Sequence, residues 1–320
     1  MKKIAVVVAF LIGLKGHAQE LNLPVFTQYL ADNPFVLSST YAGIGDNLKI
    51  RANGLTQWVG IKDAPNNQSV YADFRIADQS GVGISLYNDK NGNTQQAGGK
   101  VSFAHHIILD YYSKQYLSFG LSFNLNNFKI NINDLTPINT DAAINNNRFT
   151  SNYNFDVGLL YRLKRYYLSV NASNILSKNL DKFIAQEPGL LRNYQVYTGY
   201  IFSDGEYNRS EIETSMYFQY FESDKRSSTD INVKYRKYNS YDDYYWAGLS
   251  YRFLNDQIGE PLNIGPMAGF KKRNFYFGYS YQLTLNEFSG YNSGTHMITL
   301  GLDFLQKISN CPCTQNPVHN

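Results

Sequence analysis

The chain has 320 residues, of which 29 are basic and 26 acidic, and its formal net charge is +3. This length predicts one large domain or two ordinary ones. Removal of residues 1–18 takes away Lys2, Lys3 and Lys15 but no acidic residue, which leaves a balanced chain. Such a balance argues against nucleic acid as a partner, because nucleic-acid binding usually needs a basic face.

The first predicted element is a cleaved signal peptide at residues 1–18. Two lysines precede an apolar run over residues 4–14, and Gly16-His17-Ala18 offers small residues for cleavage. The run is too short to cross a bilayer as a helix. We therefore expect cleavage after Ala18 and export of the mature chain. The alternative is an uncleaved membrane anchor.

An aromatic, irregular segment follows at residues 19–47. Its stretch FTQYLADNPFVLSSTYAG, residues 26–43, lacks the alternation of a strand and is interrupted by an Asn-Pro pair. It carries too much apolar surface to stay free in the periplasm. We expect it to fold into the periplasmic mouth of a barrel as a plug, or else to dock on periplasmic machinery. The candidate residues are Phe26, Tyr29, Asn33, Pro34, Phe35, Tyr41 and Gly43.

Alternation of apolar and polar residues predicts strands over most of the remaining chain. In LSFGLSFNLN, residues 117–126, Leu and Phe occupy one face and Ser, Gly and Asn the other. The chain has 27 Tyr and 20 Phe, and its aromatic residues gather at strand ends like the girdle at a membrane interface. A pair of soluble β-sandwiches would alternate in the same way and is the alternative.

The predicted strands and their connections favour a membrane barrel. The connections alternate between short and long, which is typical of outer-membrane barrels with short periplasmic turns and longer outer loops. The longest are at residues 128–153 and 173–193. The strands are predicted at residues 48–58, 68–76, 81–88, 100–109, 115–126, 154–163, 166–174, 194–202, 211–221, 229–236, 244–253, 263–270, 274–283 and 295–304.

The predicted fold class is therefore all-β, a transmembrane antiparallel barrel of about 14 strands. The barrel occupies residues 48–305 and contacts the lipid of the outer membrane of a Gram-negative bacterium. Both termini are expected in the periplasm, and residues 306–320 form a free C-terminal tail there.

Both ends of the chain resemble one known family. PVFTQYLADNPF, TYAG and LTQWVGIKDAPNNQSVYADF, at residues 24–35, 40–43 and 55–74, are similar to the opening of the PorP/SprF family of type IX secretion outer-membrane proteins. Residues 277–304 are similar to the family's closing strands. The chain departs from the family where Ser38-Ser39-Thr40 replaces a second Asn-Pro, and in the residues after Phe304. The matching motif positions are Gln57, Trp58, Val59, Gly60, Ala64 and Pro65.

The resemblance implies a non-enzymatic barrel that assists export or surface retention of a large adhesin-like protein, as in gliding motility. Its expected partners are the C-terminal domain of that secreted surface protein and type IX components on the periplasmic side. Long loops on a rigid scaffold often carry binding residues, so residues 131–152, 176–192 and 287–294 are the expected docking surface.

The alternative function is a passive porin with a hydrated lumen. Charged residues at inward positions would suit such a lumen, but they could equally pair across a filled interior, which we favour. The predicted inward charges are Lys100, Asp156, Arg162, Glu213, Lys234 and Arg252.

We expect no catalytic or cofactor site in this sequence. His105 and His106 are neighbours in a predicted strand, so their rings point to opposite faces and cannot cooperate. NDKNGN at residues 88–93 lacks the closing Glu of a calcium loop and indicates a hairpin loop. Gly81 and Gly83 lie inside a strand without the helix that phosphate binding requires.

The two cysteines lie together near the C-terminus. Cys311 and Cys313 are a candidate disulfide in an oxidising periplasm. With His319 they would give too few ligands for a structural zinc site, which needs four. No metal is therefore expected.

Overall fold

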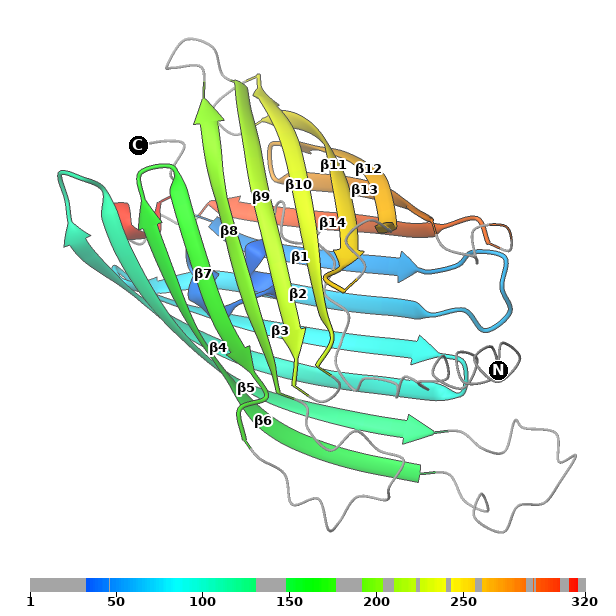
Figure 1. Ribbon diagram of the computed structural model, residues 1–320. Coiled ribbons are helices and arrows are strands. Elements are labelled where there is room, and N and C mark those ends of the chain that lie inside the picture. Colours follow the sequence, from blue (N-terminus) through cyan, green and yellow to red (C-terminus); the bar gives the residue numbers. More distant parts are fainter. Residues whose placement is uncertain are drawn as a thin grey trace, which may run out of the picture.

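The computed structural model describes residues 33–45, 47–130, 148–176, 192–203, 210–222, 225–239, 243–256, 261–285, 290, 292–305 and 311–315. Its strands form one closed antiparallel barrel in which each strand pairs with its sequence neighbours and the last pairs with the first (Figure 1). The predicted all-β barrel is confirmed, with 14 strands. They are β1 (Asn47–Thr56), β2 (Asn66–Ala77), β3 (Ser80–Asn91), β4 (Thr94–Asp110), β5 (Gln115–Ile130), β6 (Arg148–Leu163), β7 (Tyr166–Ser173), β8 (Asn193–Ser203), β9 (Ser210–Phe221), β10 (Ser227–Tyr238), β11 (Tyr244–Leu254), β12 (Pro261–Lys272), β13 (Phe275–Thr284) and β14 (Thr295–Leu305).

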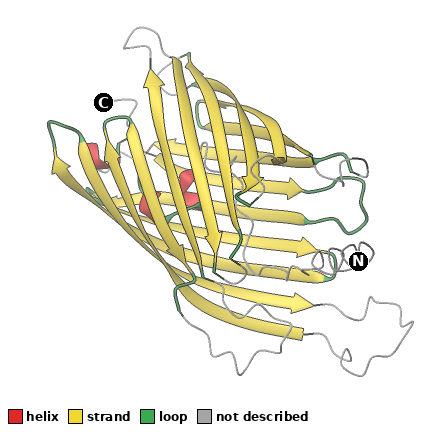
Figure 2. Cartoon of the chain, viewed as in Figure 1, coloured by secondary structure: helices red, strands yellow, loops and turns green. Residues whose placement is uncertain are grey.

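Short 3-10 helices accompany the strands. They are η1 (Pro34–Val36), η2 (Ser39–Tyr41) and η6 (Pro312–Thr314). Figure 2 shows η1 and η2 within the ring of strands and η6 near one end of it. Among the residues that the structure describes, no helix is long and apolar enough to cross a membrane.

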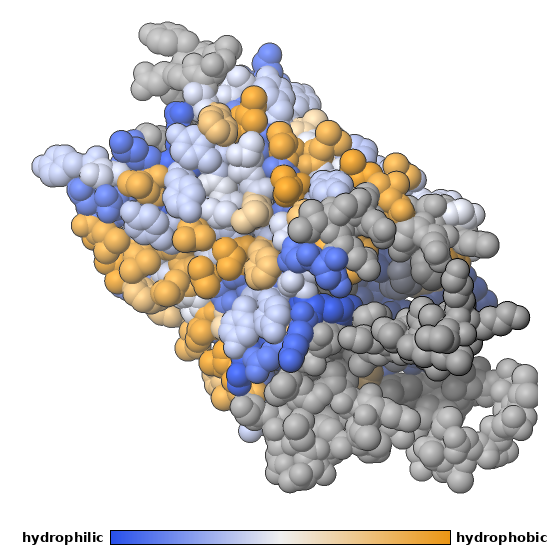
Figure 3. Space-filling view, viewed as in Figure 1, coloured by the Kyte–Doolittle hydropathy of each residue, from blue (hydrophilic) through white to orange (hydrophobic). Residues whose placement is uncertain are grey.

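The two faces of the barrel wall differ as the alternation predicts. In β5, the side chains of Phe119, Leu121 and Leu125 are exposed on the outside, whereas Ser118 and Ser122 are buried on the inside. Figure 3 shows apolar side chains gathered over the outer surface of the strands on the visible face. Such an apolar outer band is what a barrel presents to lipid.

The two ends of the barrel have different connections. We call the end at which β1 begins and β14 ends the turn end, and the opposite end the loop end. Short connections at residues 78–79, 164–165 and 273–274 lie at the turn end. The long connections at 131–147 and 174–192 lie at the loop end.

One loop-end connection is shorter than expected. β3 and β4 are joined by residues 92–93 alone, and Gly92 has a φ of +57° there. A positive φ suits glycine, which has no Cβ to clash. The predicted hairpin is therefore a tight turn. The alternation of short and long connections is interrupted here and again at the loop-end connection of residues 222–226, which is shorter than the turn-end connection of residues 204–209.

Strands β4, β5 and β6 are longer than predicted, with 17, 16 and 16 residues. β4 begins at Thr94 instead of residue 100, and β6 begins at Arg148 instead of residue 154. The added residues of β4 are polar or small on both faces, so no alternation marks them, whereas the added start of β6 carries Phe149 and Tyr153 on its outer face. Continuous cross-strand pairing from Thr94↔Ile130 to Ile108↔Tyr116 defines them instead.

Candidate functional site

The lumen contains part of the N-terminal region. We call residues 33–45 the inner segment. Phe35, Tyr41 and Ala42 are buried in one cluster with wall residues that include Leu160 and Tyr197. Ser38 caps η2, because its Oγ accepts a hydrogen bond from Thr40 N at 3.1 Å. Full burial of one large apolar side chain contributes about 1.5–3 kcal/mol, so the inner segment is firmly held.

Glycines in the barrel wall make room for the inner segment. A Cβ on Gly81 would lie 2.7 Å from the Cα of Gly43 and would also collide with the carbonyl of Ala42. A Cβ on Gly83 would collide with the ring of Phe35, and one on Gly158 would lie 2.7 Å from Ser38 Oγ. These wall positions accept the segment because glycine lets another backbone approach closely.

Substitution Gly81→Ala tests this fit. The methyl group would meet backbone atoms that cannot rotate away, so the inner segment must shift. We expect a loss of about 1–3 kcal/mol, the usual cost of overpacking, together with increased ion conductance. Urea unfolding and planar-bilayer recording of the purified protein would measure both.

The matched control is Gly278→Ala in β13. Its Cβ would lie 3.0 Å from a side-chain atom, Tyr276 Oη, and away from the inner segment. This variant should keep wild-type conductance. Equal effects of the two substitutions would contradict the fit between Gly81 and the inner segment.

Polar wall side chains bind the backbone of the inner segment. His106 Nε2 donates to the carbonyl oxygen of Ala42 at 2.9 Å, and His106 Nδ1 lies 2.8 Å from Ser118 Oγ. Gly43 N donates to Asp73 Oδ2 at 3.2 Å. Each contact satisfies a buried polar group, which would otherwise destabilise the fold.

The C-terminal end of the chain joins this assembly. We call residues 311–315 the tail segment. Cys311 and Cys313 form a disulfide, and Cys313 and Thr314 are fully buried. The tail contacts the inner segment directly, because Gly45 N donates to the carbonyl oxygen of Thr314 at 2.5 Å.

Two buried guanidinium groups hold the tail segment. Arg162 donates to the carbonyl oxygens of Cys313 and, at 3.3 Å, of Gln315. Arg75 donates to Thr314 Oγ1 and, at 3.3 Å, to the carbonyl oxygen of Gly45. This placement corrects the expectation of a free tail for these residues: backbone and side-chain oxygens of the tail accept hydrogen bonds from arginines that the barrel wall buries.

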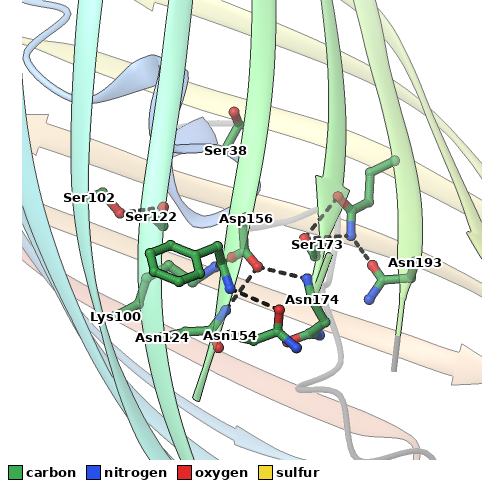
Figure 4. Close-up of polar contacts among 12 residues, drawn as sticks. Ser38, Lys100, Ser102, Ser122, Asn124, Asn154, Asp156, Ser173, Asn174 and Asn193 are labelled. Atoms are coloured by element: carbon green, nitrogen blue, oxygen red, sulfur yellow. Dashed lines mark hydrogen bonds and ion pairs between the residues drawn. The ribbon is translucent and has the colours of Figure 1, made fainter. Parts of the chain in front are cut away.

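A further polar cluster lies on the wall near Ser38 (Figure 4). Asp156 Oδ2 lies 2.6 Å from Lys100 Nζ, and its Oδ1 accepts from Asn174 N at 2.9 Å. Asn154 Oδ1 accepts from Leu176 N at 2.8 Å. The cluster therefore fastens the start of the β7–β8 connection to the inside of the wall.

Other inward charges contact side chains of the same or a nearby stretch of wall, whereas we favoured pairing across a filled interior from the sequence. Arg252 Nη2 lies 2.5 Å from Asp230 Oδ2, and Glu213 accepts a hydrogen bond from Tyr167 Oη at 2.6 Å. Lys234 Nζ lies 4.9 Å from the ring centroid of Trp246, a cation–π distance. The prediction that these charges face inward is confirmed.

The family-motif residues lie in the β1–β2 connection at the loop end. Gln57 N donates to the carbonyl oxygen of Pro65 at 2.9 Å and closes this connection. Val59 exchanges backbone hydrogen bonds with Ser293 and Gly294, in the connection between β13 and β14. Gly60 has a φ of +105°. Trp58 remains partly exposed, and Ala64 lies between the two closing residues.

The remaining sequence candidates are placed as follows. Asn33 and Pro34 begin the described part of the inner segment, and Phe26 and Tyr29 lie outside the described residues. His105 is directed away from the buried His106 and lies 3.0 Å from Ser80 Oγ, so the predicted divergence is confirmed. In the described part of the chain, no three His, Cys, Asp or Glu side chains form a metal-binding group.

Comparison with known proteins assigns the family. A profile described as type IX secretion system membrane protein PorP/SprF matches residues 18–302. The chain belongs to the PorP/SprF family. No curated protein matches this PorP/SprF chain significantly.

Several solved structures of outer-membrane proteins are similar to the PorP/SprF barrel. The CymD monoaromatic hydrocarbon channel matches with a TM-score of 0.50 and 9% identity, over 88% of this chain and 92% of that one. A deltaS2 mutant of the TodX monoaromatic hydrocarbon channel gives 0.48 and 8%, over 86% and 92%. Outer membrane phospholipase A from Escherichia coli gives 0.36 and 9%, over 86% and 94%. Family and fold together make this protein an outer-membrane β-barrel of the type IX secretion system.

Sequence reasoning did not identify the wall residues that hold the inner segment. Asp73, Arg75 and His106 all occupy inward positions of strands, where a buried charged or titratable side chain needs a partner. Their inward placement was the signal in the sequence that these residues need a partner inside the barrel.

Proposed function

We propose that this PorP/SprF barrel is a non-enzymatic factor that assists export or surface retention of a large adhesin-like protein. It binds the C-terminal domain of that protein at the loop end. The loop end faces the cell exterior and the turn end faces the periplasm, because outer-membrane barrels have short periplasmic turns. Type IX components contact the turn end.

The occupied lumen is the observation that supports this function over the passive porin. A porin needs a lumen that is open to water from end to end. Here the inner segment and the tail segment are buried together towards the turn end. The inward charges that a porin would expose to water are paired within the wall. We therefore expect intact protein in planar bilayers to show no large steady openings, and such openings would support the porin.

The family-motif connection offers an anchor for the cargo domain. Trp58 and Ile61 expose 37% and 38% of their surfaces at the loop end. Exposed aromatic residues on a fixed backbone are the commonest centres of binding energy. The backbone is fixed here by the pairing of Val59 with Ser293 and Gly294.

A double substitution, Trp58→Ala with Ile61→Ser, tests this anchor. We expect at least roughly tenfold weaker binding of the C-terminal domains of the host's type IX-exported surface proteins, as for loss of a binding hot spot. Biolayer interferometry with purified barrel would measure the affinity. The control is Lys62→Ala in the same connection, which should bind normally. Unchanged binding by the double variant would place the cargo site elsewhere.

A further inference from the structure

Strand β6 is longer than a membrane requires. It runs over 16 residues, Arg148–Leu163, whereas a strand that crosses a bilayer needs only about 9–11. The apolar outer row of β6 consists of Tyr153, Phe155, Val157, Leu159, Tyr161 and Leu163. This row alone is long enough to cross the lipid, so residues 148–152 project beyond it at the loop end.

The outer face of β5 and β6 becomes polar at the same level. Leu125 and Tyr153, which are partners in register, are the last apolar pair on this face before polar residues appear. The next outward pair is Asn127 and Ser151, and Ser151 Oγ donates to Asn127 Oδ1 at 2.7 Å. Lys129 follows in β5 and is exposed. Because only an apolar band faces lipid, this part of the wall stands in water.

One side of β6 has no neighbouring strand at this level. β5 pairs with β6 along its whole length, from Ile130↔Arg148 onward. β7 pairs with β6 only from Val157↔Ala172 onward. Figure 1 shows β5 and β6 running on past the end of β7. Among the residues that the structure describes, no strand therefore pairs with residues 148–156 on the β7 side.

The described start of the β7–β8 connection leaves this side of β6 after one contact. Ile175 N donates to the carbonyl oxygen of Phe155 at 3.0 Å. The next N–H, that of Leu176, is instead bound by Asn154 Oδ1 at 2.8 Å, on the inward face. Arg192 Nη2 donates to the carbonyl oxygen of Ile175 at 3.1 Å. These polar side chains turn residues 174–176 away from the strand.

The backbone groups of Phe149, Ser151 and Tyr153 point to the vacant side, which we call the open edge. In an antiparallel sheet, a residue directs both its N–H and its C=O to one side, and the next residue directs them to the other. The carbonyl of Phe155 points to the β7 side, so the groups of these three residues do the same. The described part of the chain offers them no backbone partner.

The open edge lacks the usual protection against pairing. Phe149 and Tyr153 expose 66% and 63% of their surfaces. The register between β5 and β6 is continuous, without a bulge that would twist the edge away. An exposed, regular edge of this kind is a template for a strand of another chain.

We propose that the open edge binds an extended strand of the exported protein's C-terminal domain, antiparallel to β6. The inference rests on the proposed function, and it adds the way in which the domain is held. Backbone hydrogen bonds give such a strand its affinity, and alternate side chains give specificity. Apolar residues of the added strand pack beside Phe149 and Tyr153. The outward row Lys90, Gln95 and Lys129 carries no acidic residue, so we expect a carboxylate at the end of the added strand near Lys129.

A second copy of the barrel does not fit the open edge. Two copies in one membrane are related by an axis along the membrane normal, so their β6 strands rise in the same direction. The strands of a membrane barrel are tilted by about 35–45°, and this axis gives the two β6 strands opposite tilts. The strands would therefore cross instead of pairing.

Substitution Ser151→Pro tests the open edge. Proline removes the N–H that points to the vacant side, leaves the hydrogen bonds to β5 intact, and is tolerated at such positions of edge strands. The control is Ser151→Ala, which keeps the N–H but also loses the hydroxyl that binds Asn127. By biolayer interferometry, S151P should bind the C-terminal domains of the host's type IX-exported surface proteins at least roughly tenfold more weakly, as for a lost hydrogen bond and a steric block. S151A should bind like the wild type.

The outcomes separate this inference from the proposed function. Equal affinities of S151P and S151A for a domain that binds the wild type would overturn the open edge and leave the proposed function standing. If no domain binds the wild type, both are overturned. Heat-dependent mobility on gels checks that both variants are folded.

Disulfide scanning tests the pairing without a proline. Ser151→Cys in the barrel is combined with single cysteines along the strands of a C-terminal domain, while the native pair Cys311–Cys313 is already bonded. An added strand predicts crosslinking at one position and at its second neighbours, with several-fold less in between, because successive side chains alternate faces. Asn127→Cys, one strand away from the edge, is the control and should crosslink weakly. Absent or uniform crosslinking of S151C, or an equal pattern with N127C, would overturn strand addition.

Discussion

Deletion of residues 20–43 is expected to leave a folded barrel with large steady ion conductance. The inner segment supplies the buried Phe35, Tyr41 and Ala42, whereas the strand register is independent of it. A barrel of this size has a lumen that its wall side chains do not fill, so its loss opens a water path. We expect single-channel conductance roughly tenfold or more above the background of intact protein.

Folding of the deletion variant is checked by heat-dependent mobility on gels. A second variant with two substitutions tests the same idea without a deletion, in case the deletion variant does not fold. Phe35→Ala with Tyr41→Ala keeps the chain length but removes the main apolar contacts of the inner segment. It should show intermediate, flickering conductance. The deletion barrel could instead fold and show no increase in conductance, but no longer form complexes or export cargo. That result would favour docking of this segment on periplasmic machinery.

Substitution Asp303→Ala is expected to destabilise the barrel by about 3–5 kcal/mol, the usual cost of removing one partner from a buried ion pair. Asp303 Oδ1 lies 2.5 Å from Arg51 Nη1, and its Oδ2 lies 3.1 Å from Lys271 Nζ. All three side chains are at most 9% exposed. The substitution therefore leaves two cations buried without their shared carboxylate. Urea unfolding in lipid vesicles would measure the change.

The control for Asp303 is the half-exposed pair of Arg192 and Glu222, with a separation of 3.4 Å. Glu222→Ala should cost no more than about 1 kcal/mol, because water solvates the remaining charge. A similar small cost for Asp303→Ala would show that water reaches the turn-end part of the lumen.

The sequence was sufficient to predict the strands whose outer face is apolar. In β5 the alternation of Phe119 and Leu121 with Ser118 and Ser122 identifies both the strand and its lipid face. The polar start of β4 was missed because both of its faces carry polar or small side chains. Only the hydrogen bonds between strands distinguish such residues from a loop.

The lumenal site was predicted only in outline. The aromatic character of Phe35 and Tyr41 marked the inner segment as one that must be buried, since apolar surface is costly in water. Its partners Asp73 and His106 could not be paired with it from sequence, because the contacts join residues 30 and 64 positions apart in the chain. The tail was missed because Arg75 and Thr314 are far apart in the chain and because Arg162 contacts backbone oxygens, which every residue has.

The seam between β1 and β14 has a consequence for biogenesis. It joins the two strands from Asn47↔Leu305 to Thr56↔His296, residues separated by nearly the whole chain. Contacts between such distant residues form late in folding. The inner segment precedes β1 directly and the tail segment follows β14, yet both lie inside the finished wall. We therefore expect the inner segment and the tail segment to pack against the sheet before β1 and β14 pair. The insertion machinery would then receive a curved, open sheet that already holds both segments.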